Sequence, residues 1–168
     1  QQATGPRPLP LFLELVRQAA ERDPVLAANA LAGLAAYQRE PRPPRPHPRQ
    51  VVAAAGGAAL RSCGGAGPPI VLVPSLINPP TILDLEPQMS LAEAMAPAGH
   101  VFLLDWGPAH ERPTLDLGDH VEQLLIPLLK ILDEPATLVG YCLGGTLALA
   151  AAALQPVRGV ATMASPWR

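Results

Sequence analysis

The stretch that decides the fold of this chain is Gly140-Tyr141-Cys142-Leu143-Gly144-Gly145. An apolar run typical of a strand precedes it, and residues 146–154 follow it as an alanine- and leucine-rich run typical of a helix. A strand that turns sharply into a helix needs glycines around its central residue, which is the pattern of a nucleophile elbow. The helix N-terminus beyond such a turn has free N–H groups and a partial positive charge, which favour a thiolate. We therefore expect Cys142 to be a nucleophile.

The sequence on either side of this turn alternates between strand and helix patterns. The predicted strands are 51–52, 58–61, 70–73, 101–104, 138–139 and 157–163, and the predicted helices are 91–95, 117–132 and 146–154. Gly56-Gly57 predicts a hairpin turn between the first two strands, and Pro127 should kink the longest helix. Strands separated by helices at this spacing indicate an α/β fold with a mostly parallel sheet and flanking helices.

The N-terminal part has a different pattern. Residues 8–39 carry apolar stripes at helical spacing, and Asp23-Pro24 divides them into two helices because aspartate caps a helix and proline suits its first position. Residues 41–49 are rich in proline and arginine, which predicts a stiff spacer whose arginines are solvated. We therefore expect a helical hairpin with a linker over 1–49 and an α/β domain over 50–168.

Composition excludes several classes of function. The net charge of −2 gives no electrostatic basis for binding nucleic acid. No run of about 18 apolar residues predicts a membrane span, and the N-terminus shows no secretory signal. Two cysteines without metal-ligand spacing suit a reducing, cytoplasmic setting. The glycines of 64–67 precede a strand instead of following one, so they are no dinucleotide fingerprint, and we expect neither a metal nor another cofactor.

Several motifs, taken in this order and spacing, resemble the polyhydroxyalkanoate synthases, a family with the α/β-hydrolase fold. In the synthases a strand leads into a Pro-Pro-x-Ile-Asn-type loop, an Ile-Leu-Asp-Leu motif, an Asn-Ser-Leu motif, a strand ending in Asp-Trp-Gly, and an elbow with cysteine in place of serine. The matching stretches here are 71–78, 82–85, Ser90-Leu91, 99–107 and 140–145. The resemblance implies the N-terminal part of an α/β-hydrolase fold, preceded by a short helical segment.

The resemblance also implies an activity and the residues that carry it. Cys142 would be the covalent nucleophile, and the backbone N–H groups of Leu143 and Leu76 would bind the oxyanion. The substrates would be (R)-3-hydroxyacyl-coenzyme A thioesters, polymerised with release of coenzyme A. Acyl transfer from one thioester to a cysteine thiol is chemically easy, and the acyl-cysteine stays reactive toward a hydroxyl. Partners would be acyl-coenzyme A, a polyester chain and a second copy of the chain.

Three residues are candidates for the wall of a substrate pocket. Asn78 lies in the loop that matches the synthases. Asp105 and Trp106 end a predicted strand, at the carboxyl edge of the sheet where α/β proteins bind ligands. Structural roles are expected elsewhere: Asp84 should support its loop, Cys63 and His100 should be structural, and His120 should face solvent. These four structural roles are predicted from the local sequence pattern alone.

The chain departs from the synthase pattern after the elbow. The family places an acid and a histidine after the nucleophile, whereas residues 143–168 contain no Asp, Glu or His. We therefore expect a truncated copy that lacks the last strands and the cap and is inactive by itself. Two alternatives stay open: a cysteine-dependent hydrolase of the dienelactone-hydrolase kind, and a non-catalytic module that binds a partner or dimerises through its sheet edge.

Overall fold

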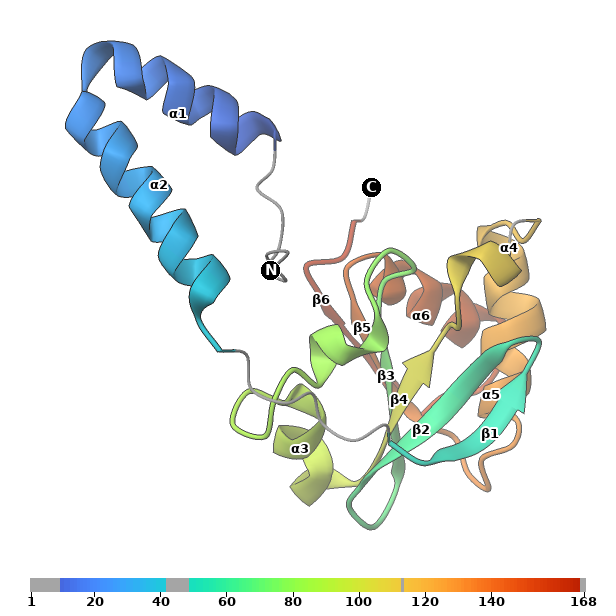
Figure 1. Ribbon diagram of the computed structural model, residues 1–168. Helices are drawn as coiled ribbons and strands as arrows, with labels where there is room; N and C mark the ends of the chain where they lie inside the picture. The colour runs from blue at the N-terminus through green and yellow to red at the C-terminus, as the bar shows by residue number, and fades with distance from the viewer. Residues whose placement is uncertain (1–9, 42–48, 113, 167–168) are drawn as a thin grey trace. The chain divides into compact units, whose positions relative to one another are not determined.

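The structure is a computed structural model that describes residues 10–41, 49–112 and 114–166. The chain divides into two compact units after residue 44 (Figure 1). Most of the predicted spacer, at 42–48, and the predicted helical residues 8–9 lie outside the described residues.

The N-terminal unit contains two helices that contact each other, α1 (Pro10–Arg22) and α2 (Pro24–Arg39). Asp23 separates them, and its Oδ1 accepts a hydrogen bond of 2.9 Å from the backbone N–H of Leu26. Pro24 occupies the first turn of α2, where its missing N–H costs nothing. The predicted pair of helices is confirmed. Ala27 is the one buried residue among those described in these two helices.

The second unit is built on a six-stranded sheet with the order β1-β2-β4-β3-β5-β6 (Figure 1). Its strands are β1 (Val51–Ala55), β2 (Ala58–Gly64), β3 (Pro69–Val73), β4 (His100–Asp105), β5 (Thr137–Tyr141) and β6 (Gly159–Met163). The β1–β2 and β2–β4 pairs are antiparallel, and the pairs β4–β3, β3–β5 and β5–β6 are parallel. The predicted α/β fold with a mostly parallel sheet is therefore confirmed.

Helices cover both faces of this sheet. The longer ones are α6 (Leu143–Leu154) and a continuous helical segment made of α4 (Leu117–Asp119), η4 (His120–Leu125) and α5 (Ile126–Leu129). The shorter ones are α3 (Leu91–Met95), η1 (Pro80–Leu83), η2 (Ala96–Ala98) and η3 (Ala109–Glu111). The elements on one face bury a cluster that includes Leu124, Leu128 and Leu147, and α3 packs on a second cluster.

The segment 117–129 corrects the predicted single kinked helix. Its central part, η4, is a π-helix in which the N–H of Ile126 donates to the carbonyl of Val121. Pro127 follows directly, lacks an N–H and would clash with the carbonyl four residues before it in a regular α-helix. The wider π turn before the proline is a recognised way to absorb such a disruption.

Strand β3 shows how the core fixes the location of functional groups. All five of its residues are buried; Val71 and Val73 belong to one apolar cluster, whereas Ile70 and Leu72 belong to the other. Both faces of the central strand are thus filled with side chains. Polar groups can gather only where the strands end, and at the carboxyl ends those groups come from the loops after β3, β4 and β5.

Candidate active site

Cys142 stands at the tightest point of the turn between β5 and α6. Its backbone has φ +54° and ψ −130°, a left-handed value that is rare for a residue with a side chain. Its N–H donates to the carbonyl of Met163 at 2.9 Å, and its carbonyl accepts from the N–H of Gly145 at 2.9 Å. These two bonds hold the strained residue in place. Leu143 begins α6, so its N–H is one of the amides that lack an acceptor within the helix.

The glycines of the elbow are required by close backbone contacts. A Cβ built on Gly140 would lie 2.3 Å from the Cα of Gly145, and a Cβ on Gly145 would lie 1.8 Å from Ser165 Oγ. A Cβ on Gly144 would lie 2.1 Å from the carbonyl oxygen of Val73. Since real Cβ atoms do not approach other atoms this closely, a side chain at any of the three positions would force the turn apart.

Gly144 also brings the elbow against the loop that follows β3. Pro74 is the first residue of this loop, and its carbonyl oxygen would lie 2.6 Å from a Cβ on Gly144. That oxygen accepts a hydrogen bond of 2.9 Å from Trp106 Nε1. Leu76 comes two residues later and packs partly buried against the larger apolar cluster. The loop that carries Leu76 therefore begins in contact with the elbow.

A pocket of about 190 Å³ lies at this edge of the sheet. Leu76, Asn78, Asp105 and Trp106, which were identified separately from the sequence, all line it together with Arg112. Cys142 and Leu143 are not among its lining residues. The structure thus brings four of the six predicted site residues to one cavity and places the other two at the neighbouring elbow.

The last residue of β4, Asp105, and the next residue, Trp106, are held firmly in the pocket wall. Asp105 Oδ2 lies 2.9 Å from the guanidinium of Arg61, and Oδ1 accepts a bond of 3.0 Å from the N–H of Gly107. Trp106 is 3% exposed, so most of its indole is packed in the core. The carboxylate of Asp105 is consequently neutralised within the protein, and Trp106 links the pocket wall to the loop after β3.

Arg112 is a pocket residue that sequence reasoning missed, because a lone arginine in a polar loop looks solvated. It is only 9% exposed; its Nη1 lies 2.5 Å from His120 Nε2, and its Nη2 donates to the carbonyl of Gly107 at 3.2 Å. Its Nε is buried without a hydrogen-bond partner. The expectation that His120 faces solvent was wrong: it is 4% exposed. Its position four residues before the buried Leu124 was the signal, since such residues share a helix face.

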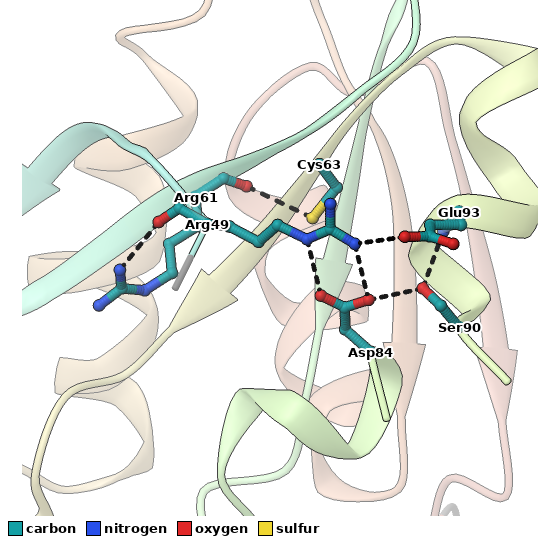
Figure 2. A network of polar contacts seen from close by, with 6 residues as sticks. All are labelled: Arg49, Arg61, Cys63, Asp84, Ser90 and Glu93. Atoms are coloured by element: carbon teal, nitrogen blue, oxygen red, sulfur yellow. Dashed lines mark hydrogen bonds and ion pairs between the residues drawn. The ribbon is translucent and has the colours of Figure 1, made fainter. Parts of the chain in front are cut away.

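A second polar cluster surrounds Asp84 on the side of the sheet where α3 packs (Figure 2). Arg49 donates to both carboxylate oxygens of Asp84, at 2.9 and 3.0 Å, and to Glu93 Oε1 at 2.8 Å. Ser90 Oγ donates to Asp84 at 2.6 Å. The Arg49 guanidinium holds the pKa of Asp84 below its ordinary value. The supporting role expected of Asp84 is confirmed, whereas the solvated state expected of Arg49 was wrong, because Asp84 and Glu93 bind it.

Cys63 lies beside this cluster and differs from the cysteine of the elbow. It is 8% exposed, and burial raises the pKa of its thiol to about 11. Its Sγ makes a weak contact of 3.8 Å with the carbonyl of Arg61 (Figure 2). This thiol stays protonated near neutral pH, which fits the structural role expected of it.

The histidines do not supply a base for Cys142 within the described part of the chain. His100 shares a hydrogen bond of 2.9 Å with Ser62 Oγ, as a structural histidine would, and His120 bonds to Arg112. His110 is exposed and lies 3.8 Å from Glu111. His47 falls outside the described residues. None of the three described histidines hydrogen-bonds to Cys142.

Within residues 10–41, 49–112 and 114–166, no group of three or more His, Cys, Asp or Glu side chains could hold a metal ion. The helices described there include none with the length and apolar character needed to cross a membrane.

The comparison with protein families decides the assignment of the second unit. A family model described as the α/β hydrolase fold matches residues 68–168, the part that contains β3, the elbow and the pocket. The chain belongs to the α/β-hydrolase fold family. A solved α/β hydrolase from Sphaerobacter thermophilus matches with a TM-score of 0.54 and 24% identity, over 70% of this chain and 46% of that one. This structural likeness concerns the fold.

Within the α/β-hydrolase fold family, the sequence is polyhydroxyalkanoate synthase-like. It is 38% identical over 106 residues to the poly(3-hydroxyalkanoate) polymerase subunit PhaC of Haloferax mediterranei, covering 58% of this chain and 22% of the relative. It is 34% identical over 94 residues to the subunit of that name from Haloarcula marismortui, covering 52% of this chain and 20% of the relative. The chain therefore spans about a fifth of the length of these curated relatives.

Proposed function

We propose that this chain carries the nucleophile of an acyltransferase of the polyhydroxyalkanoate synthase kind. The enzyme takes (R)-3-hydroxyacyl groups from coenzyme A thioesters onto Cys142 and passes them to a growing polyester. The observation that carries the proposal is the backbone contact between the elbow and the loop after β3, where a Cβ on Gly144 would lie 2.1 Å from the carbonyl of Val73. This contact supports an oxyanion site made by the amides of Leu143 and Leu76.

The proposed chemistry has two steps that share one oxyanion site. In the first, Cys142 gives up its thiol proton, its sulfur bonds to the thioester carbonyl carbon, and the bond from that carbon to the coenzyme A sulfur breaks. Coenzyme A leaves and takes up a proton. In the second, the hydroxyl of a hydroxyacyl chain attacks the acyl-cysteine, an ester forms, and the Cys142 thiol is restored. The Leu143 and Leu76 amides stabilise the negative carbonyl oxygen in both steps.

We propose that the general base is a residue outside these 168. Residues 143–168 contain no Asp, Glu or His, and the described histidines are bonded elsewhere or exposed. Cys142 lies at the N-terminus of α6, where the free amide of Leu143 can stabilise the oxyanion of the first step, so slow acylation does not require a histidine. Turnover does require one, because the attacking hydroxyl must lose its proton. We therefore propose that this chain by itself acylates but does not polymerise.

The test is incubation of the purified chain with (R)-3-hydroxybutyryl-coenzyme A, followed by peptide mass spectrometry and assay of free thiol. We expect one hydroxybutyryl group on the Cys142 peptide, with coenzyme A release that stops near about one equivalent per chain. Cys142→Ala should abolish both signals, and Cys63→Ala should leave them unchanged. An adduct on Cys63, or none on Cys142, would contradict the proposal. Continued release of free hydroxy acid would instead indicate the hydrolase.

A further inference from the structure

We propose that Arg112 forms an oxyanion-binding site in the pocket beside the elbow, which takes a carboxylate or phosphate group of a ligand. Among the described residues, four arginines form ion pairs with carboxylates at 2.8 to 3.0 Å: Arg17, Arg49, Arg61 and Arg158. Arg112 is nine-tenths buried, yet no carboxylate of the described residues pairs with it.

The two partners that Arg112 does have leave its charge uncompensated. A guanidinium can only donate, so His120 Nε2 accepts from Arg112 Nη1 at 2.5 Å. His120 Nδ1 lies 2.5 Å from the carbonyl oxygen of Asp116, and it must carry the ring proton to donate there. The imidazole therefore brings no negative charge to Arg112. The other partner is the peptide carbonyl of Gly107, which is neutral.

A buried charge without a counter-ion is costly, and the same desolvation strengthens its attraction for an incoming anion. Removal of a charged group from water costs several kcal/mol unless an opposite charge compensates it. A bound carboxylate or phosphate would supply that charge, and the planar guanidinium matches the geometry of both groups. The unpaired Arg112 is therefore better explained by a ligand than by the stability of the loop.

The surroundings of Arg112 suit an anionic group attached to a larger ligand. Asp105 is the acidic residue that lines the pocket, and its carboxylate is already paired with Arg61 at 2.9 Å, so the lining offers Arg112 no free carboxylate. Asn78 offers an amide donor, and Leu76 and Trp106 offer apolar walls. The volume of about 190 Å³ is below the roughly 300–1,000 Å³ of pockets that enclose whole drug-sized ligands. One group of a ligand fits here.

The test uses the Cys142→Ala chain, so that binding is measured without acylation and its outcome does not depend on the proposed function. Inorganic phosphate, coenzyme A and (R)-3-hydroxybutyrate are titrated separately by calorimetry and by NMR of the Arg112 guanidinium resonances. Binding of phosphate and coenzyme A would indicate a phosphate as the natural group, and binding of hydroxybutyrate would indicate a carboxylate. In either case we expect the Arg112 resonances to shift.

Variants then separate a charge effect from a folding effect. Arg112→Gln should weaken binding at least about tenfold, and Arg112→Lys should be intermediate because it keeps the charge but not the fork. Arg158→Gln, which removes an exposed arginine, should bind as the parent does. The NMR titration of the Cys142→Ala chain reports on Arg112 directly, so it tests the proposal even when Arg112→Gln does not fold. Failure of all three probes to bind, or undiminished binding to folded Arg112→Gln, would overturn the proposal.

Discussion

Two regions of the α/β unit each contain an arginine with little or partial exposure and a cysteine, and they use them in opposite ways. In the Asp84 cluster, Arg49 is bound by two carboxylates, and the neighbouring Cys63 is held as a thiol (Figure 2). In the elbow region, Arg112 is hydrogen-bonded to no carboxylate among the described residues, and Cys142 is partly exposed at a strained backbone position. The Asp84 cluster satisfies its polar groups internally, whereas the elbow region leaves its polar groups for a ligand.

The physical reason for this difference is the cost of each arrangement. A buried carboxylate destabilises a fold when its partner is lost, so the residues that pair with Asp84 are needed for stability. The Asp84 cluster therefore has a structural role. Strained backbone and unpaired charge reduce stability, and they persist where the surrounding structure enforces them. The close contacts of the elbow glycines supply that enforcement.

The sharpest contrast should lie in the reactivity of the two thiols. We expect iodoacetamide at pH 8 to modify Cys142 at least about 100-fold faster than Cys63, because a buried thiol with a pKa of about 11 is almost wholly protonated. Peptide mass spectrometry over a time course measures both rates in one sample. Modification of Cys63 at a comparable rate would remove the distinction between the two regions. Denatured protein, in which both thiols are exposed, is the control.

The elbow should tolerate no side chain at Gly144. We expect Gly144→Ala to reduce the free energy of unfolding by about 3 kcal/mol or more, because its Cβ would meet the carbonyl oxygen of Val73. Gly159→Ala is the matched control, since nothing lies within 4 Å of the Cβ position there. Urea denaturation measures both variants. Equal stability of the two would show that the elbow backbone is not held as tightly as its contacts indicate.

The Asp84 cluster should depend on its buried member far more than on its exposed one. Asp84→Asn should cost about 2 to 4 kcal/mol of stability, because it removes the buried carboxylate that accepts two hydrogen bonds from Arg49 and leaves Arg49 with Glu93 alone. Glu93→Gln should cost less than about 1 kcal/mol, because that carboxylate is 42% exposed. Urea denaturation of each variant gives the comparison. A larger loss of stability in Glu93→Gln than in Asp84→Asn would show that the cluster does not depend mainly on Asp84.

The two titrating groups beside Arg49 should destabilise the protein at opposite ends of the pH range. The pKa of Asp84 is lower in the folded state, so its contribution is present above about pH 4 and is lost as the pH falls below that value. The pKa of Cys63 is raised from 9.0 to about 11, so stability is lost as the pH rises from 9.0 toward 11. Unfolding free energies between about pH 2 and pH 11 should show both losses.

Matched variants assign each of these losses to its group. Asp84→Asn should flatten the acid side of the profile, and Cys63→Ala should flatten the alkaline side. An alkaline loss that persists in Cys63→Ala would point to another group.

Local sequence signals predicted a large part of this molecule. Three glycines around Cys142 indicated a strand-to-helix turn, because only residues without a Cβ fit that geometry. The fully apolar run at 70–73 indicated a central strand, and β3 is buried along its whole length. Asp105 and Trp106 were expected at the carboxyl edge of the sheet, and Asn78 was a pocket candidate from its loop; all three line one pocket. These features depend on neighbours in the chain or on the general topology of parallel sheets.

Pairings between distant residues could not be predicted in the same way. Arg49 lies in a proline-rich stretch that reads as solvated, and its partner Asp84 is 35 residues away. Arg112 lies in a loop, where no periodic pattern distinguishes a buried arginine from an exposed one. The π turn before Pro127 depends on how the chain accommodates a missing N–H within a packed helix.

The α/β fold, the elbow and the position of its cysteine could thus be predicted from the sequence, because backbone conformation and apolar periodicity are encoded locally. Which charges are paired and which are left open depends on the folded arrangement. A charge is neutralised or exposed by the residues that folding brings beside it, and that depends on distances across the whole domain. The difference between Arg49, bound by two carboxylates, and Arg112, bound by none of the described ones, arises at this level.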